Sequence, residues 1–229
     1  MDKIEKAKAI SIWIFIVPFF AINTCLILIT QFHELFPNHE DIIHFTIPYI
    51  DGGASISRTA RVFPTYLIFK PAMFLTSYFL IKYWLYNKAI ISSFEKNHKY
   101  TKYFVFFGIT SAIALIFHSI FLGIKFDNDL YKLFRRVIMM SFIIFEVAAQ
   151  TYLVLTLYSL KNNLKKYINE KVLTIKLVLV STLLVVGIMS IPILSSPGYK
   201  FLKHALEWDY FLGVISFYLL TFFMWKSKK

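Results

Sequence analysis

The chain has 229 residues, of which 58% are hydrophobic and 19% aromatic, and its mean hydropathy is +0.61. A soluble globular domain is much less apolar than this. The formal net charge of +12 would suggest nucleic acid as the partner of a soluble protein. Here the distribution of the charge is better explained by membrane topology, so no nucleic-acid partner is expected. The single cysteine, Cys25, excludes an intramolecular disulfide.

Six apolar stretches are each long enough, or nearly so, to cross a bilayer. They lie at about residues 9–30, 64–86, 103–124, 136–160, 173–195 and 209–225. A membrane-spanning helix needs about 20 mostly apolar residues, and in lipid the backbone must satisfy its own hydrogen bonds. Barrel strands would be shorter and alternate in polarity, which these stretches do not. The sequence predicts an all-α, multi-pass bundle of six transmembrane helices forming one domain, residues 1–229.

The basic residues in the connections predict the orientation. The side that holds both termini has fourteen, at positions 3, 6, 8, 88, 96, 99, 102, 161, 165, 166, 171, 226, 228 and 229. The other side has eight, at positions 58, 61, 125, 132, 135, 136, 200 and 203. Since cytoplasmic connections carry the excess of Lys and Arg, both termini should face the cytoplasm. The sequence leaves open which cellular membrane this is.

The first outer connection, from Gln31 to Phe63, is the longest in the chain. Pro48 and the pair Gly52-Gly53 exclude a continuous helix through it, and Ile43 to Ile50 could form a short extended segment. Long loops are usually functional or disordered. This one is too rich in aromatic and aliphatic residues for disorder, so we expect it to be ordered and to pack over the outer mouth of the bundle.

Two runs of this sequence resemble one known family. Thr46-Ile47-Pro48-Tyr49-Ile50-Asp51-Gly52-Gly53 looks like a proline-tyrosine-isoleucine-serine-aspartate-threonine-glycine signature that precedes the second span of the DRAM family, although the serine is absent here. His204-Ala205-Leu206-Glu207-Trp208, followed by an aromatic span, is similar to the last helix of that family. The family includes the damage-regulated autophagy modulators, the FRAG/SFK-type proteins and lipid-remodelling factors for GPI anchors related to the N-terminal part of CWH-type proteins. The resemblance implies a six-span protein with its N-terminus inside, whose work concerns membrane lipid, autophagy or lipid asymmetry.

Glu146 lies ten residues beyond Arg136 in the fourth predicted span, about 15 Å along a helix and close to the bilayer midplane. An ionisable group there is costly, so it should face the bundle interior and have a partner. Gln150, one turn further, shares its face. Either Glu146 binds substrate or handles protons, or it is a protonated group that hydrogen-bonds a neighbouring helix as part of the packing.

Two further polar residues lie near the outer ends of the predicted spans. Lys70, in the second span, could pair with Glu146 but is expected to extend toward the lipid head groups instead. His118, in the outer third of the third span, has Ser111 two turns below it on the same face. A single histidine there is more often a satisfied hydrogen-bonding group than a ligand.

The outer ends of the spans bring together acids, histidines and arginines. Arginine suits bidentate contact with phosphate, and short connections in a small bundle should place these residues near one another. The cluster would bind a lipid head group, support acid–base chemistry on an ester, or form an ordered cap of paired charges. The candidate lipid-binding residues are Asp51, Arg58, Arg61, His118, Glu146, His204, Glu207 and Trp208. Asp127 and Asp129 precede the fourth span on the same side.

A metal site built from His118, His204 and an aspartate is not favoured, because no two histidines share a helix at ligand spacing. We expect no metal and no cofactor, and catalytic residues are not identified. Three functions remain: a protein that binds or remodels membrane lipid on the outer-leaflet side, a non-catalytic membrane regulator or scaffold, and a small-solute or proton-coupled transporter. Membrane lipids are the expected partners, protein partners being unknown. Transporters usually show repeats and broken helices, which are absent here, so lipid handling ranks first and transport last.

Overall fold

The computed structural model describes residues 2–124 and 128–226, and these are all-helical, as the sequence predicts. The six long helices are α1 (Asp2–Gln31), α4 (Tyr66–Phe94), α5 (Thr101–Phe121), α6 (Asp129–Ser159), α8 (Glu170–Ser195) and α9 (Lys200–Met224). The short ones are η1 (His33–Leu35), η2 (His39–Asp41), α2 (Pro48–Asp51), α3 (Ile56–Ala60) and α7 (Lys161–Leu164). No strand is formed within the described ranges, apart from one isolated bridge between Ile168 and Trp225.

Five helices are long and apolar enough to cross a membrane: α1 from Lys3 onward, α5, α6, α8 and α9. Helix α4 is 29 residues long but is not among the five. It carries Lys70, Lys82 and Lys88 along its length. The length and composition of the five helices are those of a helical membrane bundle.

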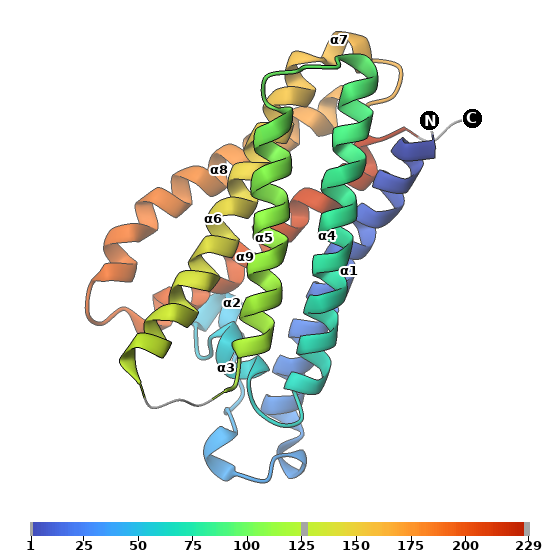
Figure 1. Cartoon of the computed structure of the whole chain (residues 1–229). Coiled ribbons are helices and arrows are strands. Elements are labelled where there is room, and N and C mark those ends of the chain that lie inside the picture. The colour runs from blue at the N-terminus through green and yellow to red at the C-terminus, as the bar shows by residue number, and fades with distance from the viewer. Residues whose placement is uncertain (1, 125–127, 227–229) are drawn as a thin grey trace.

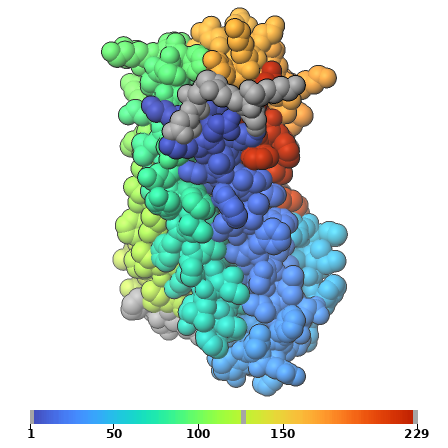
Figure 2. Space-filling model, turned by 90° about the vertical axis from the view of Figure 1, so that its right-hand side faces the viewer, coloured from blue at the N-terminus to red at the C-terminus, as the bar shows by residue number. Residues whose placement is uncertain are grey.

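The long helices form a closed ring in which each touches its two neighbours, in the order α1, α4, α5, α6, α8, α9 and back to α1. Both termini and α7 lie at one end of the bundle, which we call the terminal end (Figure 1). The segment 32–65, the end of α5, the start of α6 and the α8–α9 connection lie at the opposite end, the loop end (Figure 1). Figure 2 shows α1 along one flank, with the segment after it covering the loop end.

The long segment 32–65 differs from its prediction in one respect. The expected extended segment is wrong for Pro48 to Ile50, because Pro48–Asp51 is the short helix α2. Pro48 occupies the first helical position, where its missing N–H is not needed. Gly52 ends the helix in the left-handed conformation (φ 62°), which glycine adopts without strain.

The core is densest where α4, α5 and α9 meet. Trp84 of α4 is fully buried, and its indole lies against Gly108 of α5, where there is no room for a larger side chain. Tyr83 packs edge-on against both Trp84 and Tyr218 of α9, with ring centroids 5.0 Å apart in each case. Tyr218 belongs both to this aromatic cluster and to the group of polar residues described next.

Candidate functional site

The Glu146 side chain is buried in the bundle interior, 1% exposed, so the expectation that it faces protein is confirmed. It accepts a hydrogen bond from the Ser111 hydroxyl of α5 (2.6 Å) and one from the Gln150 amide nitrogen (3.1 Å). The Tyr218 hydroxyl of α9 donates to the same carboxylate oxygen as Gln150. We call Ser111, Glu146, Gln150 and Tyr218 the interior polar cluster.

Gln150 connects this cluster to the backbone of α9. Its amide nitrogen also donates to the Val214 carbonyl of α9 (3.1 Å). Its Oε1 atom is buried and has no hydrogen-bond partner among the described residues. The cluster therefore ties α5, α6 and α9 together and leaves one strong acceptor unsatisfied, which is uncommon in a protein interior.

Lys176 of α8 is fully buried one helix away. Its ammonium nitrogen donates to the Thr221 hydroxyl of α9 (2.6 Å) and lies 3.8 Å from the centre of the Phe217 ring. The Thr221 hydroxyl oxygen is also 3.2 Å from the Tyr83 hydroxyl. A cation over an aromatic face is stabilised, more so when desolvated. No ion pair of Lys176 with an acid occurs in the part of the chain that the structure describes.

At the loop end, the residues of the predicted outer cluster mainly dock segment 46–60 onto α9. The His204 ring nitrogen Nδ1 is 2.9 Å from the Gly52 carbonyl, and the Trp208 indole donates to the Ala54 carbonyl (2.8 Å). The Glu207 carboxyl faces the backbone amides of Ile56 and Ser57, at the start of α3. These contacts bring together the two runs that carry the family resemblance.

Asp51 holds its own turn rather than reaching toward α9. Its carboxylate accepts hydrogen bonds from the Thr46 hydroxyl, the Ile47 amide (2.9 Å) and the Gly53 amide (2.8 Å). These donors, led by Thr46, lower the pKa of the Asp51 carboxyl below its ordinary value. Tyr49, also on α2, packs against Trp208 with ring centroids 4.9 Å apart. The turn is therefore a rigid unit anchored on α9.

The other predicted loop-end residues do not join this docking contact. Arg58 is half-buried and Arg61 is exposed, and neither forms an ion pair with an acid within the described ranges. Asp129 pairs with Lys132 at 3.0 Å, and Asp127 lies outside the described residues, as do Lys125, Lys228 and Lys229 of the charge count. Neither of the two pockets described below lies between Asp51 and Glu207.

Arg135 forms a second cationic site, between α5 and α6, with the His118 ring beside it. Arg135 is the positive charge that acts on the His118 ring, and its guanidinium lies 6.0 Å from the centre of the Tyr131 ring. The Arg135 Nε atom is buried without a hydrogen-bond partner among the described residues. Lys70, by contrast, donates to the Ile120 carbonyl at the end of α5 (3.3 Å) and does not pair with Glu146.

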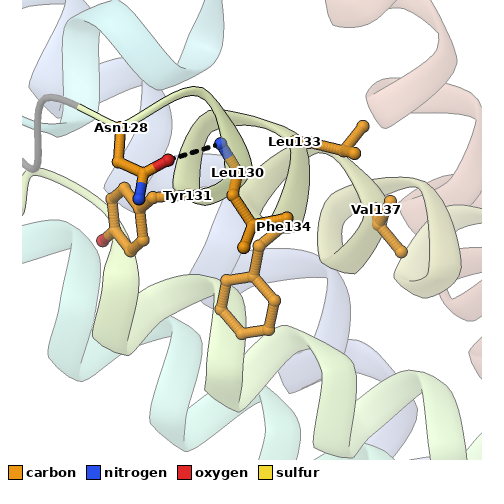
Figure 3. A pocket seen from close by; sticks show the side chains of 6 residues that line it. All are labelled: Asn128, Leu130, Tyr131, Leu133, Phe134 and Val137. Atoms are coloured by element: carbon orange, nitrogen blue, oxygen red, sulfur yellow. Dashed lines mark hydrogen bonds between the residues drawn. The ribbon is translucent and has the colours of Figure 1, made fainter.

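An open, apolar pocket of about 510 Å³ adjoins this cationic site. Its walls come from the first turns of α6, and Figure 3 shows the six side chains that line it: Asn128, Leu130, Tyr131, Leu133, Phe134 and Val137. Leu130, Leu133 and Val137 are each more than half exposed. A second pocket, at the terminal end, is lined by charged and polar residues around Asn169 and Lys226.

Sequence reasoning missed Tyr83, Arg135, Lys176 and Tyr218 as members of these sites. Lys176 carries the same signal as Glu146, an ionisable residue inside an apolar span, and that signal could have found it. The two tyrosines stand in aromatic runs and show their role only in three dimensions. Among the described residues, no group of three or more His, Cys, Asp or Glu side chains could hold a metal ion.

Comparisons with protein-family models, with curated proteins and with solved structures give no match for this chain. The class of protein that the fold defines is thus a helical membrane bundle, on the evidence of its five long apolar helices.

Proposed function

We propose that this is a six-span membrane protein, with both termini in the cytoplasm, that binds a phospholipid from the outer-leaflet side. The sixth span would be α4. It lies in the ring between α1 and α5, two helices that are apolar enough to cross the membrane. A helix of 29 residues is about 43 Å long, enough to accompany them across the bilayer. Its lysines can extend toward either surface.

The observation that carries the proposal is the buried Nε atom of Arg135, which has no hydrogen-bond partner among the described residues and lies near an apolar pocket. A buried guanidinium nitrogen without a partner is costly, and an anionic oxygen would satisfy it. Arg135 lies six residues into α6, about 9 Å from its first residue, at the depth expected for a lipid phosphate. His118 supplies a second donor there, and the side chains of Figure 3 supply an apolar surface for an acyl chain.

The chemistry around Arg135 favours binding over remodelling. The nearest described side chains supply one cation, the neutral His118 ring and aromatic surfaces, and among them there is no pair of nucleophile and base of the kind that acyl transfer requires. We interpret the contacts at the loop end as structural, since the His204 ring and the Trp208 indole form their hydrogen bonds with the loop backbone.

The family resemblance is part of this proposal. The two runs that carry it contact each other through Gly52 and Ala54, which supports a shared structural role for them. We propose membership of the DRAM family on those runs. A grafted loop would test it: residues 46–54 of this chain are replaced by the corresponding segment of a family member. The grafted segment should dock onto α9 and keep the loop protected from hydrogen exchange.

Lipid that co-purifies with the protein tests the binding site. The wild-type protein, Arg135→Gln and Arg136→Gln should be purified in parallel and their bound phospholipid identified and quantified by mass spectrometry. Arg136 is the matched control, because it is the next residue of the same helix and is exposed. Loss of a charged hydrogen bond of about 1.4 kcal/mol corresponds to a tenfold loss of affinity, so Arg135→Gln should retain about tenfold less phospholipid.

Equal phospholipid in all three proteins would overturn the proposal, since it would mean that the lipid is a non-specific annulus. His118→Gln adds a second arm, because it removes the imidazole ring from the site while Arg135 stays in place; it should also lower the retained phospholipid. Unchanged thermal stability of each variant in detergent would show that a loss of lipid is not a loss of fold.

A further inference from the structure

We propose that Glu146 is a proton-binding site inside the bundle, and that Lys176 lies on the route by which its proton exchanges with the terminal end. This site is distinct from the Arg135 site and does not rest on lipid binding. Glu146 lies 13 residues from the end of α6 at Ser159, about 20 Å along the helix. Lys176 lies six residues from the start of α8 at Glu170, about 9 Å along it.

The hydrogen bonds of Ser111 allow Glu146 to be either charged or neutral. The Ser111 hydroxyl is within reach of two acceptors, the Glu146 carboxyl (2.6 Å) and the Gly108 carbonyl of its own helix (2.9 Å). When Glu146 is ionised, Ser111 donates to it. When Glu146 is protonated, its own O–H donates to Ser111, and Ser111 turns to the Gly108 carbonyl. No hydrogen bond is lost in either state.

Gln150 and Tyr218 provide a second adjustable contact. The Tyr218 hydroxyl donates to Glu146 and also lies within interaction distance of the Gln150 side chain, whose Oε1 has no partner among the described residues. Once the carboxyl is neutral, a turn of the Gln150 amide would bring Oε1 to the Tyr218 hydroxyl as an acceptor. An acceptor left open beside an acid is what a site with two protonation states needs.

The other titratable groups that face Glu146 come from three helices. Tyr218 of α9 contacts it directly, and Tyr83 of α4 interacts with it through space. Lys176 of α8 stands behind Thr221, which it shares with Tyr83. The neighbours on α5 and α6, Ser111 and Gln150, are neutral. Within the described structure, the one buried acid and the one buried amine are thus linked by hydroxyl groups.

The route runs from Lys176 through Thr221 to Tyr83, and from Tyr218 to Glu146. Each of these three contacts is a hydrogen bond or an approach of 3.2 Å or less: amine to hydroxyl, hydroxyl to hydroxyl, and hydroxyl to carboxylate. Between Tyr83 and Tyr218 the rings touch edge-on, with centroids 5.0 Å apart, and this step of the proposed route requires a water molecule or a side-chain movement between the two hydroxyls. When a proton passes from the Lys176 ammonium group to the Glu146 carboxylate, both groups become neutral and their summed charge does not change.

Infrared spectroscopy of the protein in lipid nanodiscs tests the site. Over a pH titration, the wild-type protein should show the carbonyl band of a carboxylic acid that appears and disappears reversibly. This band should be absent from Glu146→Gln, an isosteric change, and present in Asp209→Asn, a control at an exposed acid of α9. In Ser111→Ala the band should remain but shift in frequency, because the acid loses its hydrogen-bond acceptor.

The route is tested by the rate of the same signal after a rapid change of pH. Lys176→Met should keep the band and slow its response by about tenfold or more, as expected when a relay group is removed. Lys171→Met, at an exposed position in the first turn of α8, should respond at the wild-type rate. If the titrating band survives in Glu146→Gln, the proton site is wrong. If Lys176→Met responds as fast as Lys171→Met, the route is wrong although the site stands.

Discussion

The two halves of the bundle differ in how α6 and α8 are packed. On α6, every buried residue lies from Glu146 onward, toward the terminal end, and residues 129–145 include none. On α8, the buried residues are Leu173, Lys176, Val180 and Leu183, and none follows. The same two helices are therefore core in one half of the molecule and surface in the other (Figure 1).

This difference explains where polar groups can be buried. We call the half of the bundle toward the terminal end the closed half. Glu146, Gln150 and Lys176 all lie there, where neighbouring helices supply hydrogen-bond partners. The half toward the loop end, which we call the open half, exposes apolar side chains, among them Ile188 and Met189 of α8. Lipid can cover these side chains at no cost. A membrane protein can thus keep its ionisable site dry in one half while offering a surface to lipid in the other.

The largest effect is expected at a glycine of the closed half. A side chain added at Gly108 would overlap the indole of Trp84, so Gly108→Leu should destabilise the fold by about 3 kcal/mol through overpacking. The open half offers the matched control Gly187→Ala, where the nearest atom is the Tyr210 hydroxyl, 3.2 Å from the added carbon. Unfolding in mixed detergents would measure both. Equal losses of stability in the two variants would show that the halves are packed alike.

A smaller effect is expected at Gly52, where the loop meets α9. Its φ of 62° costs about 1–2 kcal/mol for a residue with a Cβ, and the added carbon would overlap the Phe201 carbonyl. Gly52→Ala should release segment 46–60 from α9 and leave the helices assembled. Hydrogen exchange would show faster exchange in the loop alone. Faster exchange across α6 and α8 as well would mean that the loop supports the whole bundle.

Much of this fold could be predicted from hydropathy, because a bilayer imposes a length on each span. The ends of the helices could not. Helix α4 continues to Phe94 past its predicted end at residue 86, through Asn87 and Lys88, since a helix in contact with neighbours tolerates polar residues beyond the membrane. Helix α6 begins at Asp129, before its predicted start at residue 136, where the Asn128 side chain caps it by accepting a hydrogen bond from the Leu130 amide (2.8 Å).

The candidate sites were predicted only in part, for a physical reason. Glu146 and Gln150 could be placed on one face from their spacing, and the structure confirms that they contact each other. The partners Tyr218 and Ser111 lie on other helices, and spacing within one helix says nothing of them. Lys176 was missed, although an ionisable residue inside an apolar span is itself a signal of a buried partner. The loop turn was readable from Pro48 and Gly52, although its short helix was missed.

Removal of one hydrogen bond between loop and bundle should have a modest effect. Trp208 is fully buried, and its indole donates to the Ala54 carbonyl (2.8 Å). Trp208→Phe keeps most of the aromatic surface and loses the donor, so stability should fall by about 1 kcal/mol. Trp225→Phe is the control, since that buried indole nitrogen has no partner among the described residues. Thermal unfolding should show a larger loss for Trp208→Phe than for Trp225→Phe.

The smallest effect is a pH dependence of the loop through Asp51. Hydrogen bonds from Thr46, Gly53 and Ile47 lower the pKa of the Asp51 carboxyl in the folded state, so the unfolded loop binds its proton at a higher pH than the folded loop does. The stabilisation is therefore complete above the unfolded value of about 3.9 and is lost as the pH falls through the folded value. Because the side chain is exposed, solvent screens it and the effect is small.

Hydrogen exchange of residues 46–54, corrected for the intrinsic rate, should become faster in acid for the wild-type protein and stay unchanged for Asp51→Asn. Asp41→Asn, a change at an acid of the same loop whose contact with Asn38 is long, at 3.5 Å, should keep the wild-type dependence. A loop that opens in acid to the same extent in Asp51→Asn would assign the effect to another group and leave Asp51 without a part in holding the turn.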